Sequence, residues 1–133
     1  MFSIVSKLKR KRKEKEKKFL RLKISKKVEE ISKKIKSKKE VNFLHSGHLG
    51  DIINSLPFIK EISKNKKCNL FIHLNKKINN QNVNLLHPAK GYFLTNTSYL
   101  KLLPLLKKQP FLKKVDIYKK QSIDINLDLF RDL

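Results

Sequence analysis

The chain is poor in the residues that crosslinked or metal-binding domains use. It contains one cysteine, one methionine, three glycines and no tryptophan among 133 residues. A single cysteine cannot form an internal disulfide, so Cys68 is expected to be an inert core thiol in a reducing compartment. His45, His73 and His87 have no ligand spacing with one another or with Cys68. The sequence therefore predicts no metal site and no cofactor.

Long hydrophobic runs are absent as well. No segment approaches the roughly 18 consecutive apolar residues that a membrane-spanning helix needs. The N-terminus lacks the apolar core and the cleavage site of a secretory signal. The expected location is the cytoplasm, with peripheral attachment to the inner face of the membrane as an alternative.

Acidic residues are scarce relative to basic ones. The chain has 33 Lys and Arg against 11 Asp and Glu, a formal net charge of +22, and residues 1–40 hold 18 of the basic and five of the acidic residues. Such a charge favours nucleic acid, anionic lipid or acidic substrates as partners and does not define a fold. Lysine outnumbers arginine 29 to 4, so codon bias in an AT-rich genome also explains part of the excess.

Residues 1–40 form a basic arm with helical periodicity. Its apolar residues step by four, four, three and four: Leu20, Ile24, Val28, Ile31 and Ile35. This spacing predicts an amphipathic helix. A basic amphipathic helix favours an anionic membrane surface or an acidic partner. A solvated charged helix or a disordered leader explains the same composition equally well.

From residue 41 onward, strand and helix patterns alternate. Residues 41–45 read as a short buried strand, and apolar residues then recur at helical spacing between Ile52 and Ile62. Residues 69–74 read as a second strand. Two strands joined by a crossover helix predict a parallel, right-handed βαβ unit.

The same rhythm continues toward the C-terminus. Ser98 is expected to cap a further helix, which ends near Pro110. Residues 115–118 read as a third strand, and residues 123–128 alternate as a fourth. The pattern predicts an α/β domain over residues 41–133.

The most informative segment lies where the first strand turns into the first helix of this domain. Its candidate binding residues are Ser46, Gly47, His48 and Gly50. Backbone N–H groups at such a helix start favour an anion or another ligand, and the glycines are expected to serve positive φ or close approach of a ligand. A surface histidine without a role explains His48 equally well.

Asp51 is the candidate catalytic residue of this segment. A carboxylate repels phosphate, so Asp51 either caps the helix and complements its dipole or takes part in chemistry.

Residues 46–62 (SGHLGDIINSLPFIKEI) resemble the first strand–loop–helix of heptosyltransferase-like glycosyltransferases, the lipopolysaccharide heptosyltransferase family with the GT-B fold. Residues 102–115 resemble the next recognisable block of that family, and residues 123–129 are similar to the strand that follows. The order of the three blocks carries most of the resemblance.

The resemblance implies an incomplete Rossmann-like parallel sheet, the acceptor-side domain of a GT-B enzyme, over residues 41–133. It implies transfer of sugar from a nucleotide-sugar donor to a glycan or lipid-linked acceptor, with Asp51 as the general base. The family holds the donor mainly in a second domain, so we expect a truncated glycosyltransferase. Alone, this chain is expected to bind acceptor weakly or not at all and to transfer no sugar.

A nucleic-acid-binding module is the alternative. The segment from Gly47 to Ile53 fits a Gly-x-x-Gly-x-x-Ile pattern, similar to the clamp of KH domains, and the net charge suits RNA. KH clamps usually hold basic residues between the glycines, where this chain has His48 and Leu49.

Overall fold

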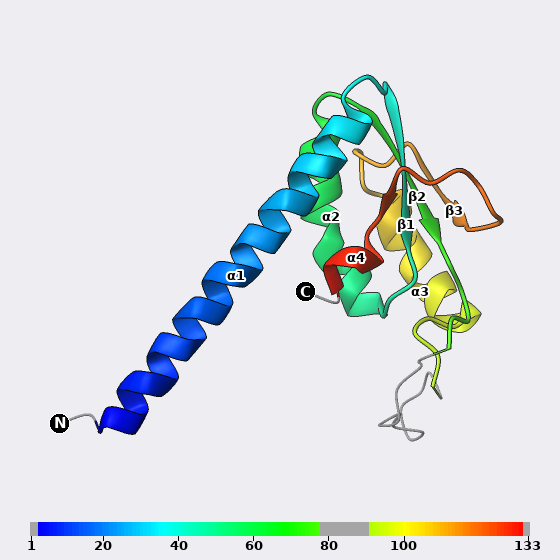
Figure 1. The fold of residues 1–133 in the computed structure, drawn as a ribbon. Coiled ribbons are helices and arrows are strands. Elements are labelled where there is room, and N and C mark those ends of the chain that lie inside the picture. Colours follow the sequence, from blue (N-terminus) through cyan, green and yellow to red (C-terminus); the bar gives the residue numbers. More distant parts are fainter. Residues whose placement is uncertain (1–2, 78–90, 132–133) are drawn as a thin grey trace. The chain divides into compact units, whose positions relative to one another are not determined.

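The structure is a computed structural model that describes residues 3–77 and 91–131 (Figure 1). The chain divides into two compact units, one ending at Lys36 and one beginning at Ser37. The first unit consists of one long helix, and the second is an α/β domain.

Helix α1 (Ile4–Ile35) is continuous over 32 residues, which corresponds to about 48 Å at the usual rise per residue. Ser3 caps its start, because the Ser3 hydroxyl accepts a hydrogen bond from the backbone N–H of Ser6 at 3.3 Å. Residues 9–13 are consecutive basic residues, so positive charge surrounds this part of the helix. No helix of the described residues is long and apolar enough to cross a bilayer.

The second unit is built on a four-stranded sheet with the order β3-β2-β1-β4. The strands are β1 (Glu40–His45), β2 (Lys67–Ile72), β3 (Lys114–Ile117) and β4 (Ile125–Asn126). Every pairing is parallel, with Val41 opposite Cys68 and Leu70 opposite Val115. The α/β class and the parallel sheet predicted from the sequence are confirmed.

Two helices cover one face of this sheet. Helix α2 (Leu49–Ser63) connects β1 to β2, and helix α3 (Asn96–Lys107) precedes β3. Helix α2 contacts β2 and α3 contacts β3, and the two helices also contact each other. Their buried residues recur at helical spacing: Ile52, Leu56 and Ile59 in α2, and Tyr99, Leu102 and Leu106 in α3. The short helix α4 (Asp128–Arg131) follows β4.

The hydrophobic core lies between these helices and the sheet. In β1 the buried residues alternate as Val41, Phe43 and His45, because successive side chains point to opposite faces of a strand. Phe43 is fully buried, and its ring meets the ring of Phe58 from α2 edge to face, with 6.3 Å between the centroids. This layer holds β1 and α2 together and so fixes where the intervening turn lies.

Two local predictions were wrong. Thr95, not Ser98, caps α3: the Thr95 hydroxyl accepts a hydrogen bond from the backbone N–H of Ser98 at 3.3 Å, which places Ser98 inside the first turn. The fourth strand is much shorter than residues 123–128, because only Ile125 and Asn126 pair with β1. The Asn126 side chain then accepts a hydrogen bond from the backbone N–H of Asp128 at 3.0 Å, and the chain turns into α4.

Cys68 is expected to react with Ellman's reagent at pH 8 far more slowly in the folded protein than in urea. The residue is 1% exposed, and burial raises the pKa of its thiol to about 11. The reactive thiolate is therefore about one thousandth of the folded population at pH 8. Absorbance of the released thionitrobenzoate measures both rates, and equal rates would show that Cys68 is accessible.

Candidate functional site

The turn after β1 lies where the strand order of the sheet reverses direction. From β1 the chain continues through α2 to β2 on one side, whereas β4 pairs with the other side of β1. In open parallel α/β sheets, ligands bind outside the carboxyl ends of the strands at such a switch point. The structure thus places the five candidate residues between Ser46 and Asp51 at the position where this architecture binds ligands.

Asp51 is the third residue of α2. Its Oδ2 accepts a hydrogen bond from the backbone N–H of His48 at 3.3 Å, and its side chain is half-exposed. This contact satisfies one backbone donor at the helix start, where a negative charge also complements the helix dipole. The capping interpretation of Asp51 therefore has a direct observation, and within residues 3–77 and 91–131 its second oxygen makes no hydrogen bond.

His48 is the N-terminal cap residue of α2, and its ring packs on an aromatic side chain. The His48 and Phe93 rings meet edge to face, with 5.2 Å between the centroids. Phe93 is held by a backbone hydrogen bond of its N–H to the Lys76 carbonyl at 3.0 Å, and the neighbouring residues Lys77 and Tyr92 form an antiparallel bridge. His48 is thus positioned by a segment that lies before α3 in the chain.

Gly50 does not need a left-handed conformation. It lies inside α2 with no φ in the positive range, so positive φ is wrong as its explanation. A Cβ at Gly50 would meet no atom within 4 Å. The second sequence-based explanation, close approach of a ligand, is compatible with this open space.

Gly50→Ala is expected to raise the free energy of unfolding by about 0.5–1 kcal/mol, because alanine loses less conformational entropy in a helix than glycine does. Urea unfolding followed by tyrosine fluorescence measures this change, since all three tyrosines lie in the second unit. A destabilised variant would show that Gly50 meets a steric restriction.

Sequence reasoning missed a buried polar network at the start of the turn. Asp128 Oδ1 accepts a hydrogen bond from the backbone N–H of Ser46 at 3.0 Å, and its Oδ2 accepts one from the Ser46 hydroxyl. Lys76 Nζ lies 3.3 Å from Ser46 Oγ and 3.7 Å from Asp128 Oδ2. Ser46 is 1% exposed and Asp128 is also buried. Figure 1 shows α4, which Asp128 begins, beside the chain that leaves β1.

His45 completes this network. Its Nδ1 accepts a hydrogen bond from the backbone N–H of Gly47 at 2.9 Å and lies 3.5 Å from Asp128 Oδ1. His45 and Asp128 together therefore fix the backbone of Ser46 and Gly47.

The five candidate residues consequently have different positions. Ser46 is buried and its polar groups bind Asp128, so its contribution is to hold the turn. Gly50 and Asp51 lie in the first turn of α2, where groups outside the sheet can reach them. One sequence signal could have found Asp128: it is the last residue of the fourth strand pattern, and the carboxyl ends of parallel strands meet at one edge.

No cluster of three or more His, Cys, Asp or Glu residues that could hold a metal ion occurs in residues 3–77 and 91–131. His87, one of the histidines considered from the sequence, lies outside the described residues.

Comparisons with known proteins give no relative for this chain: no protein-family model, no curated protein and no solved structure matches it. The resemblance to heptosyltransferase-like enzymes therefore rests on the residues and the order of the blocks alone.

Proposed function

We propose that residues 41–133 are the acceptor-side domain of a sugar-transferring enzyme of the heptosyltransferase-like type. The observation that carries the proposal is the position of the Leu-Gly-Asp turn, Leu49 to Asp51, at the carboxyl edge of a parallel sheet beside its switch point. The resemblance that the sequence shows in residues 46–62 fits this position. Transfer itself requires the nucleotide-sugar donor, which the resemblance assigns to a second domain.

Asp51 is the general base in this proposal. An acceptor hydroxyl oxygen attacks the anomeric carbon of the donor, the bond from that carbon to the nucleotide phosphate oxygen breaks, and the hydroxyl proton passes to the Asp51 carboxylate. A base on the first turn of a packed helix is held more rigidly than one on a loop. The Asp51 side chain is half-exposed and bonds only one backbone N–H through Oδ2 in the described residues, so an acceptor hydroxyl can reach it.

The buried network supports the same proposal by fixing the geometry of the turn. Asp128 and His45 bind the backbone N–H groups of Ser46 and Gly47. The two residues that precede His48 are therefore held inside the domain, and both are buried, so the part of the turn that a ligand can reach begins at His48. Preorganisation of this kind lowers the cost of binding, because fewer groups are ordered when the ligand arrives.

An NMR titration of the whole chain tests the proposal. The sequence left open whether the chain alone binds acceptor weakly or not at all, and the preorganised turn favours weak binding. We therefore expect a delipidated lipopolysaccharide core oligosaccharide to shift the backbone amide resonances of residues 47–51 at millimolar concentration, with no transfer of sugar when a nucleotide sugar is added. Asp51→Asn should retain these shifts, since a general base is not needed for binding. Absence of shifts in residues 47–51, or shifts confined to α1, would contradict the proposal.

No observation in the described residues favours the nucleic-acid clamp at the same place. Strand β1 ends at His45, and Leu49 and Gly50 belong to α2, so the Gly-x-x-Gly pattern lies partly inside a helix rather than in a loop. A salt titration separates the two functions, because an RNA complex loses affinity steeply between low and moderate salt.

A further inference from the structure

Helix α1 exposes apolar side chains outside the stripe from Leu20 to Ile35. The sequence already marks Val5 and Leu8 among them as a short apolar face at the start of the arm. Ile4, Val5, Leu8, Phe19 and Leu22 are each between 56% and 77% exposed. Exposed apolar residues are unremarkable one at a time, but a row of them on one face of a basic helix indicates a binding surface.

These residues share one side of the helix. Ile4 and Leu8 are four residues apart, Phe19 and Leu22 are three apart, and the eleven residues from Leu8 to Phe19 make just over three whole turns. The row therefore consists of two apolar anchors on the same face: Ile4, Val5 and Leu8 at one end, and Phe19 and Leu22 at the other. The anchors lie about 20 Å apart along the axis.

This row differs from the stripe that the sequence predicted for membrane contact. Leu22 in the row and Ile24 in the stripe are two residues apart, so their side chains point about 200° apart around the axis. Val28, the most exposed member of that stripe, is 40% exposed, below every member of the row. The row is thus a separate surface.

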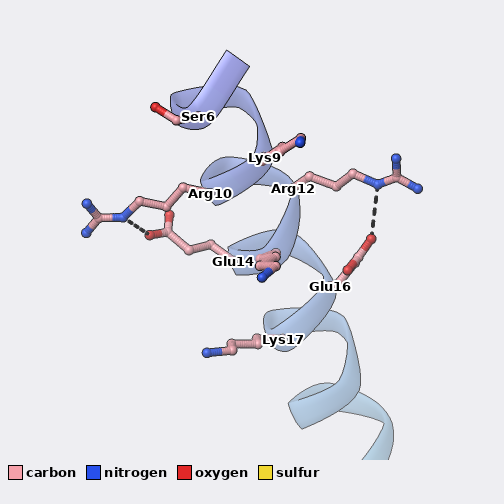
Figure 2. Close-up of a pocket in the computed structure, with 8 residues that line it drawn as sticks. Ser6, Lys9, Arg10, Arg12, Glu14, Glu16 and Lys17 are labelled. Carbon is pink, nitrogen blue, oxygen red and sulfur yellow. Dashed lines mark hydrogen bonds and ion pairs between the residues drawn. The ribbon is translucent and has the colours of Figure 1, made fainter. Parts of the chain in front are cut away.

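Basic residues lie between and opposite the two anchors. Lys11, Arg12 and Lys15 fall between Leu8 and Phe19 in the sequence and lie on the same side of the helix as the row. The opposite side of the helix carries Ser6, Lys13 and Lys17, which are among the residues drawn in Figure 2. Long basic side chains beside apolar anchors extend to the lipid headgroups while the anchors insert, as in interfacial helices.

Ion pairs remove little of the positive charge. Arg10 bonds Glu14 at 3.3 Å and Arg12 bonds Glu16 at 3.1 Å, and Figure 2 shows the two pairs on opposite sides of the helix. The helix carries 15 basic residues against four acidic ones. Its charge complements an anionic surface. A nucleic-acid partner would contact the basic side chains but would leave the exposed isoleucine and leucine side chains without a binding role. A lipid surface accounts for both the basic and the apolar side chains.

We propose that residues 4–22 of α1 bind an anionic membrane surface, with Ile4, Val5, Leu8, Phe19 and Leu22 inserted at the level of the headgroups and the lysines on the lipid phosphates. Long lysine side chains next to the anchors reach the phosphates because their stems are flexible. The proposal does not depend on the sugar-transfer function of the second unit.

Vesicle co-sedimentation of the whole chain tests this surface. We expect binding to mixed phosphatidylcholine–phosphatidylglycerol vesicles and none to phosphatidylcholine alone, because each lysine near an anionic leaflet contributes to binding. Phe19→Gln should weaken binding to the mixed vesicles by about tenfold or more. The change removes an aromatic ring that becomes buried in the membrane on binding, and it leaves the charge unchanged. The matched control is Val28→Gln, the same kind of change in the predicted stripe, which should alter binding less than twofold.

Circular dichroism should show that both variants keep α1. Equal effects of Phe19→Gln and Val28→Gln, or no effect of either, would overturn the proposal, as would equal binding to the two kinds of vesicle. Tight binding of a labelled single-stranded RNA at moderate salt, without binding to the mixed vesicles, would assign the surface to nucleic acid instead.

Discussion

Asp128→Ala is expected to lower the free energy of unfolding of the second unit by about 3 kcal/mol. The substitution leaves the backbone N–H and the hydroxyl of Ser46 without their acceptor at a position that is 1% exposed. It also removes the carboxylate that lies 3.7 Å from Lys76 Nζ. Urea unfolding followed by tyrosine fluorescence measures the loss in the second unit alone, because all three tyrosines lie there.

Asp116→Ala is the matched control for this change. Asp116 lies in β3, its side chain is 45% exposed, and its Oδ1 accepts a hydrogen bond from the neighbouring Ile117 N–H at 2.8 Å. An exposed carboxylate of this kind contributes less than about 1 kcal/mol. If Asp128→Ala were no more destabilising than Asp116→Ala, the buried network would not hold the turn.

Phe43→Ala should lower the free energy of unfolding of the second unit by a larger amount, about 3–5 kcal/mol. Phe43 is fully buried in β1, and its removal leaves a cavity between β1 and α2. A domain of about this size has a total stability of roughly 5–10 kcal/mol, so the variant will be close to unfolding. The same urea titration, followed by tyrosine fluorescence, measures this loss of stability.

Two further variants keep this prediction testable when Phe43→Ala does not fold. Phe43→Leu retains most of the volume and should cost about 1–2 kcal/mol. Phe58→Ala removes the other ring of the pair from a partly buried position and should cost about 1 kcal/mol. A larger loss for Phe58→Ala than for Phe43→Ala would contradict the position of the core.

The secondary structure near the turn was predictable because local pattern and burial agree there. Alternation of buried residues marks β1, and Ile52, Leu56 and Ile59 recur at helical spacing on the buried face of α2. The capping of α3 was less predictable, because Thr95 and Ser98 both carry a hydroxyl and only the path of the chain selects Thr95.

The length of β4 depends on contacts that no local pattern contains. Asp124 accepts a hydrogen bond from the backbone N–H of Asn42 at 2.9 Å and also contacts Lys38. These contacts place the segment beside β1 before its two paired residues, and the hydrogen bond between Asn126 and Asp128 ends the strand. Alternation alone predicted six residues because it does not reveal where the partner strand ends.

The site was predictable in position but not in construction. The position of the turn between Ser46 and Asp51 was predictable because the sequence shows a strand pattern, a glycine-containing segment and a helix pattern in that order. Asp128 is 82 residues from Ser46 and Lys76 is 30 residues from it. Their meeting is a consequence of the strand order, which places the carboxyl ends of β1 and β4 side by side.

The affinity of the Gly50→Leu chain for the core oligosaccharide, relative to the unchanged chain, tests the central claim most directly. Leucine suits a helix, and the space beside Gly50 is open within 4 Å of a Cβ, so the variant should fold normally. If the ligand occupies that space, leucine should weaken binding by at least tenfold in the same NMR titration. Binding of equal strength by a folded Gly50→Leu chain would contradict a ligand site at the turn between β1 and α2.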